Sequence, residues 1–188
     1  MDLPTFLSQS PDLGDPASAT KLATRWTSAL ARKGTIIAVQ GEPETHEYIV
    51  LDGRVASCII DAEGRAVCVG MYVGPCVVTP QVARSNEGIS LVSIEAKTDA
   101  LVARLDSAAL TTLMLENEPI RDWANDVLRR ELSRKADREW CLAALGGAER
   151  LIWFRERYPG YEQQFSHSLI ASFIGITPVT FSRLRNSA

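Results

Sequence analysis

The apolar residues of this chain change their spacing near its middle, and this change limits the folds that the chain can adopt. Residues 34–106 form short runs rich in β-branched residues, separated by glycine, aspartate and proline. Such runs predict antiparallel strands in a roll or barrel. After Asp106 the apolar residues recur at three- and four-residue steps, which predicts helices. The sequence therefore predicts an α+β protein in which an antiparallel β jelly-roll precedes a helical segment.

The turn residues place the individual strands. We expect strands within residues 34–43, 46–53, 54–60, 65–73, 89–96 and 100–106. Asp61-Ala-Glu-Gly64 predicts a hairpin turn between two of them. Upstream, residues 18–31 predict a helix that Ser18 or Thr20 can cap. The apolar face of that helix would consist of Leu22, Ala23, Trp26 and Leu30.

Two helices are expected directly after the β-rich segment, a short one over residues 107–118 and a longer one over 119–140. The longer helix carries an apolar stripe formed by Ile120, Ala124, Val127, Leu128, Leu132, Ala136 and Trp140. Such a stripe is typical of a dimer seam, but equally of a helix packed on its own domain. Gly146-Gly147 then interrupts the pattern, and this predicts a boundary between domains near residues 141–146.

The C-terminal segment has the spacing of a helix-turn-helix. Residues 149–160 predict one helix, and a loop is expected from there to Ser166, which caps the next helix. Ala171 is small where two helices would cross, and Gly175 tolerates the left-handed backbone of the turn. Apolar residues complete the pattern at Ile170, Ile174, Ile176, Phe181 and Leu184. Thr177-Pro178 predicts the start of the second helix, because proline suits a first helical turn.

If this unit reads DNA, its outward side chains would make the contacts. Arg183 is the long donor best placed for a base edge, since arginine binds guanine with two hydrogen bonds. Val179 or Thr180 would contact a thymine methyl group, and Ser166, His167 and Thr177 suit phosphate contacts. The expected DNA-binding set is Ser166, His167, Thr177, Pro178, Val179, Thr180, Ser182, Arg183 and Arg185.

Charge and composition narrow the classes of function. The chain has a net charge of −3, but residues 141–188 carry five arginines against three glutamates, so a polyanion would bind at this end. The sequence lacks a long apolar run and a secretion signal, which predicts a cytoplasmic protein that does not enter a membrane. Four cysteines and two histidines show no metal-ligand spacing, and no nucleophile–base pattern is found. We therefore expect no enzymatic activity, metal or cofactor.

These motifs together resemble the Crp/Fnr family of bacterial transcription regulators over roughly residues 18–188. Residues 48–55 (YIVLDGRV) are similar to the family pattern YIVxxGxV, and the hairpin DAEGR at 61–65 and the segment 96–100 also match. The C-terminal sequences ERLIWFRERYPG and IASFIGITPVTFSRLR resemble a subgroup without a C-terminal wing. The resemblance implies a cyclic-nucleotide-binding-like barrel over 1–118, a dimerisation helix over 119–141 and a helix-turn-helix domain over 142–188.

The resemblance also implies partners: double-stranded DNA, a second copy of the chain and RNA polymerase. It implies that residues of the 119–140 stripe form the dimer interface, namely Ile120, Ala124, Val127, Leu128 and Leu132. The expected function is a homodimeric transcription regulator with a pseudo-palindromic operator. Two alternatives remain: a ligand-sensing or interaction protein whose C-terminal helices no longer bind DNA, and a DNA-binding protein whose barrel is only a dimer scaffold.

The chain departs from the family pattern at the ligand site. Family members that bind cyclic AMP carry Gly-Glu and then Arg-Ser, and the corresponding positions here are Thr79-Pro80 and Ser90-Leu91. A buried phosphodiester without a cation is costly, so cyclic AMP is not the expected ligand. Arg84 is interpreted as a surface loop residue that could otherwise bind an anion. Thr79, Arg84 and Ser90 thus mark a possible pocket for an unknown effector.

Cysteine placement also differs from that of iron–sulfur members of the family. No cysteine precedes Cys58, and a cluster needs about four convergent thiolates. Cys58 and Cys68 flank the predicted hairpin and are interpreted as small core residues. Cys76 is the best candidate for a redox-sensitive thiol, although burial in an inert setting is the favoured interpretation. His46 is weak evidence for haem.

Overall fold

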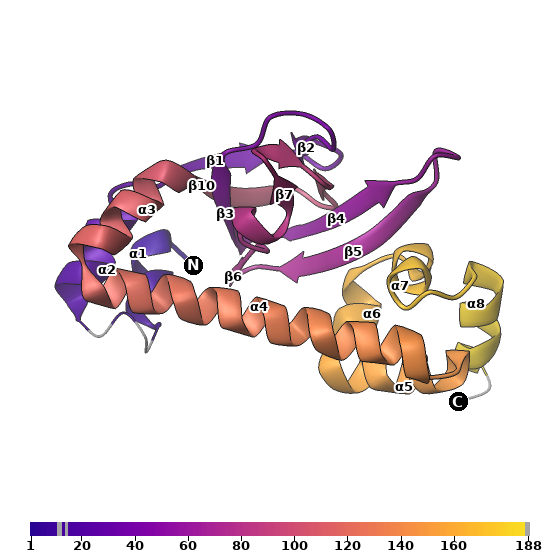
Figure 1. Cartoon of the computed structure of the whole chain (residues 1–188). Helices are drawn as coiled ribbons and strands as arrows, with labels where there is room; N and C mark the ends of the chain where they lie inside the picture. Colours follow the sequence, from indigo (N-terminus) through magenta and orange to yellow (C-terminus); the bar gives the residue numbers. More distant parts are fainter. Residues whose placement is uncertain (11–12, 14, 187–188) are drawn as a thin grey trace.

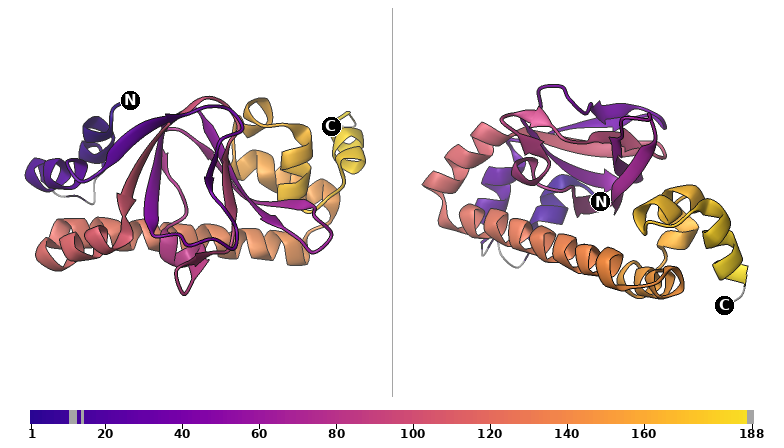
Figure 2. Two further views of the ribbon diagram at one scale, coloured as in Figure 1. Left: turned by 90° about the horizontal axis from the view of Figure 1, so that it is seen from above. Right: turned by 45° about the vertical axis from the view of Figure 1, so that its right-hand side comes forward.

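The computed structural model describes residues 1–10, 13 and 15–186 of the chain. Figure 1 shows a β-roll lying above one long helix, with small helices at both ends of that helix. The two further views in Figure 2 show the N-terminal helices and the C-terminal helices at opposite ends of the molecule. The long helix therefore connects the barrel side of the protein to the C-terminal unit.

The β-roll consists of two four-stranded antiparallel sheets and a small hairpin. The first sheet has the order β1-β10-β3-β6 and the second β2-β9-β4-β5, while β7 pairs with β8. The strands are β1 Thr27–Ala31, β2 Ile36–Ala38, β3 His46–Asp52, β4 Arg54–Ile60, β5 Ala66–Val73, β6 Cys76–Val77, β7 Ser85–Asn86, β8 Ile89–Ser90, β9 Ser93–Ala96 and β10 Ala100–Asp106. The predicted α+β class and the antiparallel jelly-roll are confirmed, and strands lie within each of the predicted ranges, whereas β1, β6 and β7 were not predicted.

Strand β3 is covered by apolar side chains on both of its faces. Its Val50 packs between the two sheets, whereas Ile49 and Leu51 pack outward against helices. Since successive side chains of a strand point to opposite faces, a strand covered on both faces reads as a continuous apolar run. Tyr48-Ile-Val-Leu51 is such a run, and all four residues are buried.

The helices before and after the roll are α1 Leu3–Ser8, α2 Pro16–Ala23, α3 Ser107–Glu116, α4 Glu118–Ala144, α5 Gly147–Arg157, α6 Tyr161–Gln164, α7 His167–Phe173 and α8 Pro178–Asn186, and the 3-10 turn η2 Gln81–Ala83 lies within the roll, between β6 and β7. The long predicted helix is confirmed and extends a few residues further at its C-terminal end. Helix α6 lies where the sequence predicted only a loop before Ser166.

The helix predicted over residues 18–31 is wrong in its second half. Asp15, rather than Ser18 or Thr20, caps α2 by accepting a hydrogen bond from the Ser18 amide. The helix ends at Ala23, and Thr27–Ala31 pairs antiparallel with β10 instead. Local apolar spacing fits a helix there, but the edge of β10 supplies a partner strand, and this tertiary contact overrides the local preference.

Candidate nucleic-acid interface and ligand pocket

Helices α7 and α8 form the helix-turn-helix that the sequence predicts. Ser166 caps α7 by accepting from the Leu169 amide at 3.3 Å, and Thr177 Oγ1 accepts from the Thr180 amide at 3.1 Å at the start of α8. Gly175 has a φ of +67°, in the left-handed region that favours glycine. The Ile176 amide donates to the Ala171 carbonyl at 2.9 Å, and this bond closes the turn.

The apolar residues of the motif lie inside the unit. Ile170, Ala171, Ile174 and Phe181 are buried, and Ile176 and Leu184 pack against the same cluster. This cluster also contains Trp153 and Phe154 of α5, so helix α5 completes the core beneath the two motif helices. The turn therefore has a fixed geometry, which a DNA-reading element requires.

The predicted contact residues lie on the outer surface. Eight of them are exposed, and Thr180 is half-buried. Val179 is 80% exposed at the start of α8, where an apolar side chain gains nothing from its own chain. Arg185 Nη1 lies 3.0 Å from His167 Nε2, and the His167 ring packs against Phe181. The structure thus brings the predicted set together on one accessible surface.

The other arginines of this region serve the fold instead. Arg150 donates to the carbonyls of Leu142, Leu145, Ile174 and Gly175 at 2.8–3.3 Å, so it caps the end of α4 and holds the turn of the motif. Arg155 pairs with Glu162 and Arg157 with Asp137. Arg183 and Arg185 of α8 are both exposed on the surface of the unit, whereas Arg150 is held by backbone carbonyls, a distinction that net charge along the sequence does not make.

The helix-turn-helix is held against the barrel by polar contacts to the β4–β5 hairpin. The Cys68 amide donates to Ser172 Oγ at 2.9 Å, and Ser172 Oγ donates to the Ala66 carbonyl at 3.4 Å. Arg138 of α4 donates to the Phe173 carbonyl and to the Cys68 carbonyl. Its guanidinium also lies over the Phe173 ring, 4.5 Å from the centroid. One arginine thus joins the long helix, the hairpin and the end of α7.

A cavity of about 570 Å³ lies where the barrel, α4 and the C-terminal unit meet. Thr79, Arg84 and Val92 line it from the barrel, Glu131 and Arg138 from α4, and Phe173 from α7, among others. The sequence therefore identified two residues of a real cavity, Thr79 and Arg84. Ser90 is buried, but its hydroxyl is bound to the Val92 carbonyl and does not line the cavity.

Arg84 is a correction to the sequence interpretation, which placed it on a surface loop. It is only 2% exposed. Its Nε donates to the Thr79 carbonyl at 2.9 Å and its Nη2 to the His46 carbonyl. Its Nη1 lies 3.8 Å from Glu44 Oε2 without a hydrogen bond, and the guanidinium covers the Tyr48 ring. The long-range pairing of the barrel strands buries this arginine, and local sequence cannot show that.

Glu131 is the site residue that sequence reasoning missed. This carboxylate of α4 is buried, and it accepts hydrogen bonds from Thr79 Oγ1 at 2.5 Å and Arg134 Nη2 at 2.6 Å. Tyr72 shares a further hydrogen bond with Thr79 Oγ1 at 2.7 Å. The sequence offered one signal for this residue: Glu131 stands beside the apolar stripe of the predicted helix. A carboxylate that is buried there needs a hydrogen-bonding partner, which would have marked it as a site residue.

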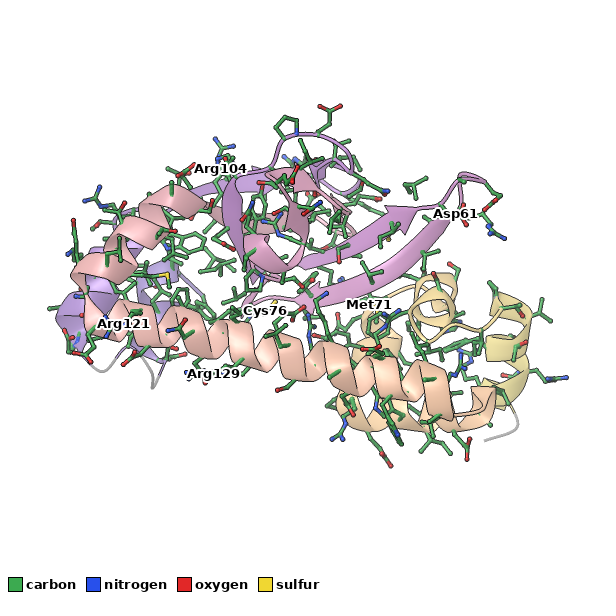
Figure 3. The ribbon with its side chains drawn as sticks, viewed as in Figure 1. Asp61, Met71, Cys76, Arg104, Arg121 and Arg129 are labelled. Atoms are coloured by element: carbon green, nitrogen blue, oxygen red, sulfur yellow. The ribbon has the colours of Figure 1, made fainter. Side chains whose placement is uncertain are left out.

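The expected dimer stripe of α4 is divided by the fold. Ile120 is completely buried in its own chain, and Ala124 and Val127 pack against the same core, so Ile120 is not available to a partner. Leu132 and Trp140 are each 54% exposed, Ala136 is also exposed and Leu128 is half-buried. In Figure 3, Arg129 lies on the side of α4 away from the barrel. The accessible apolar stripe therefore consists of Leu128, Leu132, Ala136 and Trp140.

Cys76 does not have the environment of a reactive thiol. In Figure 3 it lies between the barrel and α4. Burial raises the pKa of its thiol to about 12, so the thiolate is scarce at neutral pH. In the described part of the chain, no cluster of histidine, cysteine, aspartate or glutamate could hold a metal ion. No helix among the same residues is long and apolar enough to cross a membrane.

Comparison with known proteins identifies the barrel. Residues 30–117 match the family model of the cyclic nucleotide-binding domain. No curated protein sequence matches the chain. Among solved structures, FixK2 from Bradyrhizobium japonicum is similar with 20% identity and a TM-score of 0.74, over 86% of this chain and 83% of FixK2. A CooA mutant from Carboxydothermus hydrogenoformans matches with 16% identity and a TM-score of 0.74, over 100% of this chain and 84% of CooA.

A third similar structure is a candidate transcriptional regulator of the Crp/Fnr family from Eubacterium rectale. It has 18% identity and a TM-score of 0.68, over 92% of this chain and 82% of that protein. These three neighbours share the arrangement of roll, long helix and C-terminal helices. These likenesses confirm the predicted fold, and the subgroup without a C-terminal wing stays a prediction.

Proposed function

Because residues 30–117 form a cyclic nucleotide-binding domain and the chain has the fold of Crp/Fnr regulators, we propose that this protein is a DNA-binding transcription regulator. The observation that carries the proposal is the helix-turn-helix formed by α7 and α8, whose predicted contact residues lie on its outer surface. Helix α8 would enter the major groove, with Arg183 at a base edge and Ser166, His167 and Thr177 near phosphates.

The protein would bind its operator as a homodimer through α4. The exposed stripe of Leu128, Leu132, Ala136 and Trp140 lies on the helix that carries the C-terminal unit. A second copy packed along this stripe would relate the two α8 helices by twofold symmetry. Two recognition helices about one helical turn apart, roughly 34 Å, would then meet the two halves of a pseudo-palindrome.

The dimer is tested by replacing Leu132 with glutamate and measuring mass in solution by sedimentation. A charge within an apolar seam should shift the protein to the monomer, because the buried carboxylate would lack a partner. Leu115→Glu is the matched control, since Leu115 is 81% exposed on α3, away from the stripe. An unchanged dimer in Leu132→Glu would contradict this interface.

The DNA test first maps the genomic DNA that the protein binds and selects one bound site. Affinity is then measured for this selected site and for a random duplex. Arg183→Ala should lower the affinity for the selected site by about 1–3 kcal/mol and affect random duplex much less. Arg65→Ala, with the same charge change at the hairpin tip, should leave affinity unchanged. Equal losses on both duplexes would assign Arg183 to phosphate contact. Absent or salt-insensitive binding would instead favour a sensing or interaction protein without a DNA target.

The cavity between the barrel and α4 is the proposed effector site, and cyclic AMP is not the proposed ligand. Thr79 Oγ1 already donates to the Glu131 carboxylate, and the neighbouring cations Arg134 and Lys135 are paired with that same carboxylate. Arg84 is already bound to carbonyls of its own chain. Thermal-shift measurements with cyclic nucleotides, haem and small metabolites test this. A response to micromolar cyclic AMP would contradict it, and no response to any would favour the barrel as a dimer scaffold.

The proposal includes contact with RNA polymerase. When the protein is bound at a promoter, its barrel and its C-terminal unit would be exposed next to the polymerase. Transcription in vitro from a promoter that carries the selected site tests this point. Whether transcript increases or decreases with added protein shows activation or repression, and no change would contradict a regulatory role.

A further inference from the structure

Two cysteines of the β4–β5 hairpin stand opposite one another. In the antiparallel register, Cys58 pairs directly with Cys68. A β-bulge follows, because the next pair joins Ser57 to Gly70 and leaves Val69 unpaired. Residues that oppose each other in this way project to the same face of a sheet. Both cysteines accordingly belong to one apolar cluster, beneath the C-terminal helices.

The geometry of such a pair suits a covalent bond. Opposed residues in antiparallel strands have Cα atoms about 4.5–5.5 Å apart. A disulfide spans Cα separations of about 4.4–6.8 Å, so the bond can form after a local backbone shift that leaves the strands paired. Both thiols are free in the structure.

The two thiols also influence each other's titration. A hydrogen bond with Cys68 lowers the pKa of the Cys58 thiol, against the burial that raises it. The same hydrogen bond, together with burial, raises the pKa of Cys68. Cys58 is 9% exposed and Cys68 is fully buried. The pair therefore has a more acidic, more accessible thiol and a protonated, inaccessible one, which is the asymmetry of an attacking and a resolving cysteine.

The backbone of Cys68 also makes hydrogen bonds that join the β4–β5 hairpin to α7 and α4. Its amide donates to Ser172 Oγ, and its carbonyl accepts from Arg138 Nη2 at 3.2 Å. Its thiol donates to the Gly70 carbonyl at 3.5 Å. A bond formed at Cys68 Sγ would remove this last contact and displace the backbone to which Ser172 and Arg138 are attached.

From this arrangement we propose that Cys58 and Cys68 form a redox-sensitive thiol pair, which a peroxide oxidises to a cross-strand disulfide beneath α7. Cys58 releases its proton, and the thiolate attacks one peroxide oxygen. The O–O bond breaks, the departing hydroxide takes up the proton that Cys58 released and leaves as water, and Cys58 becomes a sulfenic acid. Cys68 sulfur then attacks Cys58 sulfur, the S–O bond breaks, and the departing hydroxide takes the Cys68 proton as a second water. Two thiols lose two electrons, and hydrogen peroxide is reduced to two waters.

The consequence is a change at the docking contact of the helix-turn-helix. Oxidation replaces a contact between two thiols by a bond of about 2.05 Å, which draws the strands together at Cys68. The hydrogen bonds to Ser172 and Arg138 would lengthen, and α7 would be held less firmly on the hairpin. The disulfide itself does not depend on the proposed function, but any effect on DNA affinity rests on it.

The experiment treats the full-length protein with excess hydrogen peroxide, quenches it by alkylation and maps the peptides by mass spectrometry. We expect a link between the peptides that contain Cys58 and Cys68, formed within one chain and reversed by dithiothreitol. Two of the four thiols should be lost. The Cys58→Ser variant should lose the link, whereas Cys76→Ser should form it as the wild type does. Circular dichroism confirms that both variants are folded.

Hydrogen exchange of the reduced and oxidised protein tests the coupling. Amides of residues 66–70 and 171–174 should exchange at least about fivefold faster after oxidation, as expected when local contacts weaken by about 1 kcal/mol. Oxidation of Cys76 or Cys141 in place of the pair, sulfinic acid at Cys58 without the link, or no thiol loss from the folded protein would overturn the thiol pair. Unchanged exchange in disulfide-bonded protein would overturn the coupling. Neither outcome depends on whether the protein binds DNA.

Discussion

Replacing Arg138 with alanine tests whether one side chain holds the C-terminal unit in place. Its guanidinium makes three hydrogen bonds to two carbonyls, with Nε and Nη2 bonded to Phe173 at 3.1 and 2.9 Å and Nη2 to Cys68 at 3.2 Å. Phe173 is the last residue of α7, so this contact serves a carbonyl that has no partner within its helix. Arg138→Ala would therefore leave two carbonyls without a donor and separate three parts of the fold.

The size of the effect follows from these contacts. Hydrogen bonds from a charged group contribute about 1.5–3 kcal/mol each, and an unsatisfied buried acceptor costs about 1–3 kcal/mol. The stacking over Phe173 adds about 0.5–1 kcal/mol. Because Arg138 is half-buried, water can replace part of the loss, and such contributions do not add fully. We expect the free energy of unfolding to fall by about 2–4 kcal/mol, guided by the lower end of these values.

The assay is urea unfolding followed by tryptophan emission, together with hydrogen exchange of α7. Trp153 lies buried in α5 and reports on the C-terminal core. Arg138→Lys keeps the charge but not the planar donor pair, so it should lose about 1–2 kcal/mol. Arg129→Ala is the matched control, because Arg129 is exposed on the same helix and should change stability by less than about 0.5 kcal/mol.

If Arg138→Ala loses no more stability than Arg129→Ala, Arg138 does not hold the C-terminal unit in place. The same conclusion follows if the loss is seen in the barrel while the exchange of α7 stays unchanged. Agreement between the loss of stability and faster exchange at α7 and Cys68 would show that the guanidinium joins the two parts.

Two further predictions concern other parts of the site. Gly175→Ala should lower stability by about 1–2 kcal/mol from the left-handed backbone, plus a further loss because its Cβ would lie 3.0 Å from Arg150 Nη1. Gly64→Ala has the same backbone cost without a neighbour within 4 Å, so equal losses in urea unfolding would refute the steric part. Glu131→Gln should lower stability by about 1–3 kcal/mol, because Arg134 and Thr79 lose a charged acceptor. Glu139→Gln on the exposed side of the same helix should be neutral, and equal melting temperatures of the two variants would contradict a structural role for Glu131.

The helix-turn-helix could be predicted almost residue by residue because its constraints are local. A small residue, a glycine and five apolar positions at fixed offsets define the crossing of two adjacent helices, and hydroxyl caps act within three residues of their partners. The β4–β5 hairpin could also be predicted from the sequence, because its turn residues are local. Counting outward from a four-residue turn at Asp61–Gly64 would set Cys58 opposite Val67. The observed register differs by one residue and sets Cys58 opposite Cys68.

The residues that were misplaced depend on contacts between distant parts of the chain. Thr27–Ala31 became a strand because β10 offered an edge, and Arg84 became buried because barrel strands close over it. The division of the α4 stripe, with Ile120 inward and Leu132 outward, depends on how the helix is rotated against the barrel. Spacing along a helix shows that a stripe exists, but only packing decides which part of it faces its own chain.

The sequence by itself determined the order and type of most of the longer elements, since apolar period, turn residues and caps act over a few positions. It also determined the helix-turn-helix and the likeness to a regulator family. The tertiary structure alone decided which arginines remain on the surface, that Glu131 closes the cavity beside Thr79, and that Cys68 lies where the hairpin meets α7. Burial, charge pairing and cross-strand contact arise between residues far apart in the chain, and their energies exist only once the fold has brought them together.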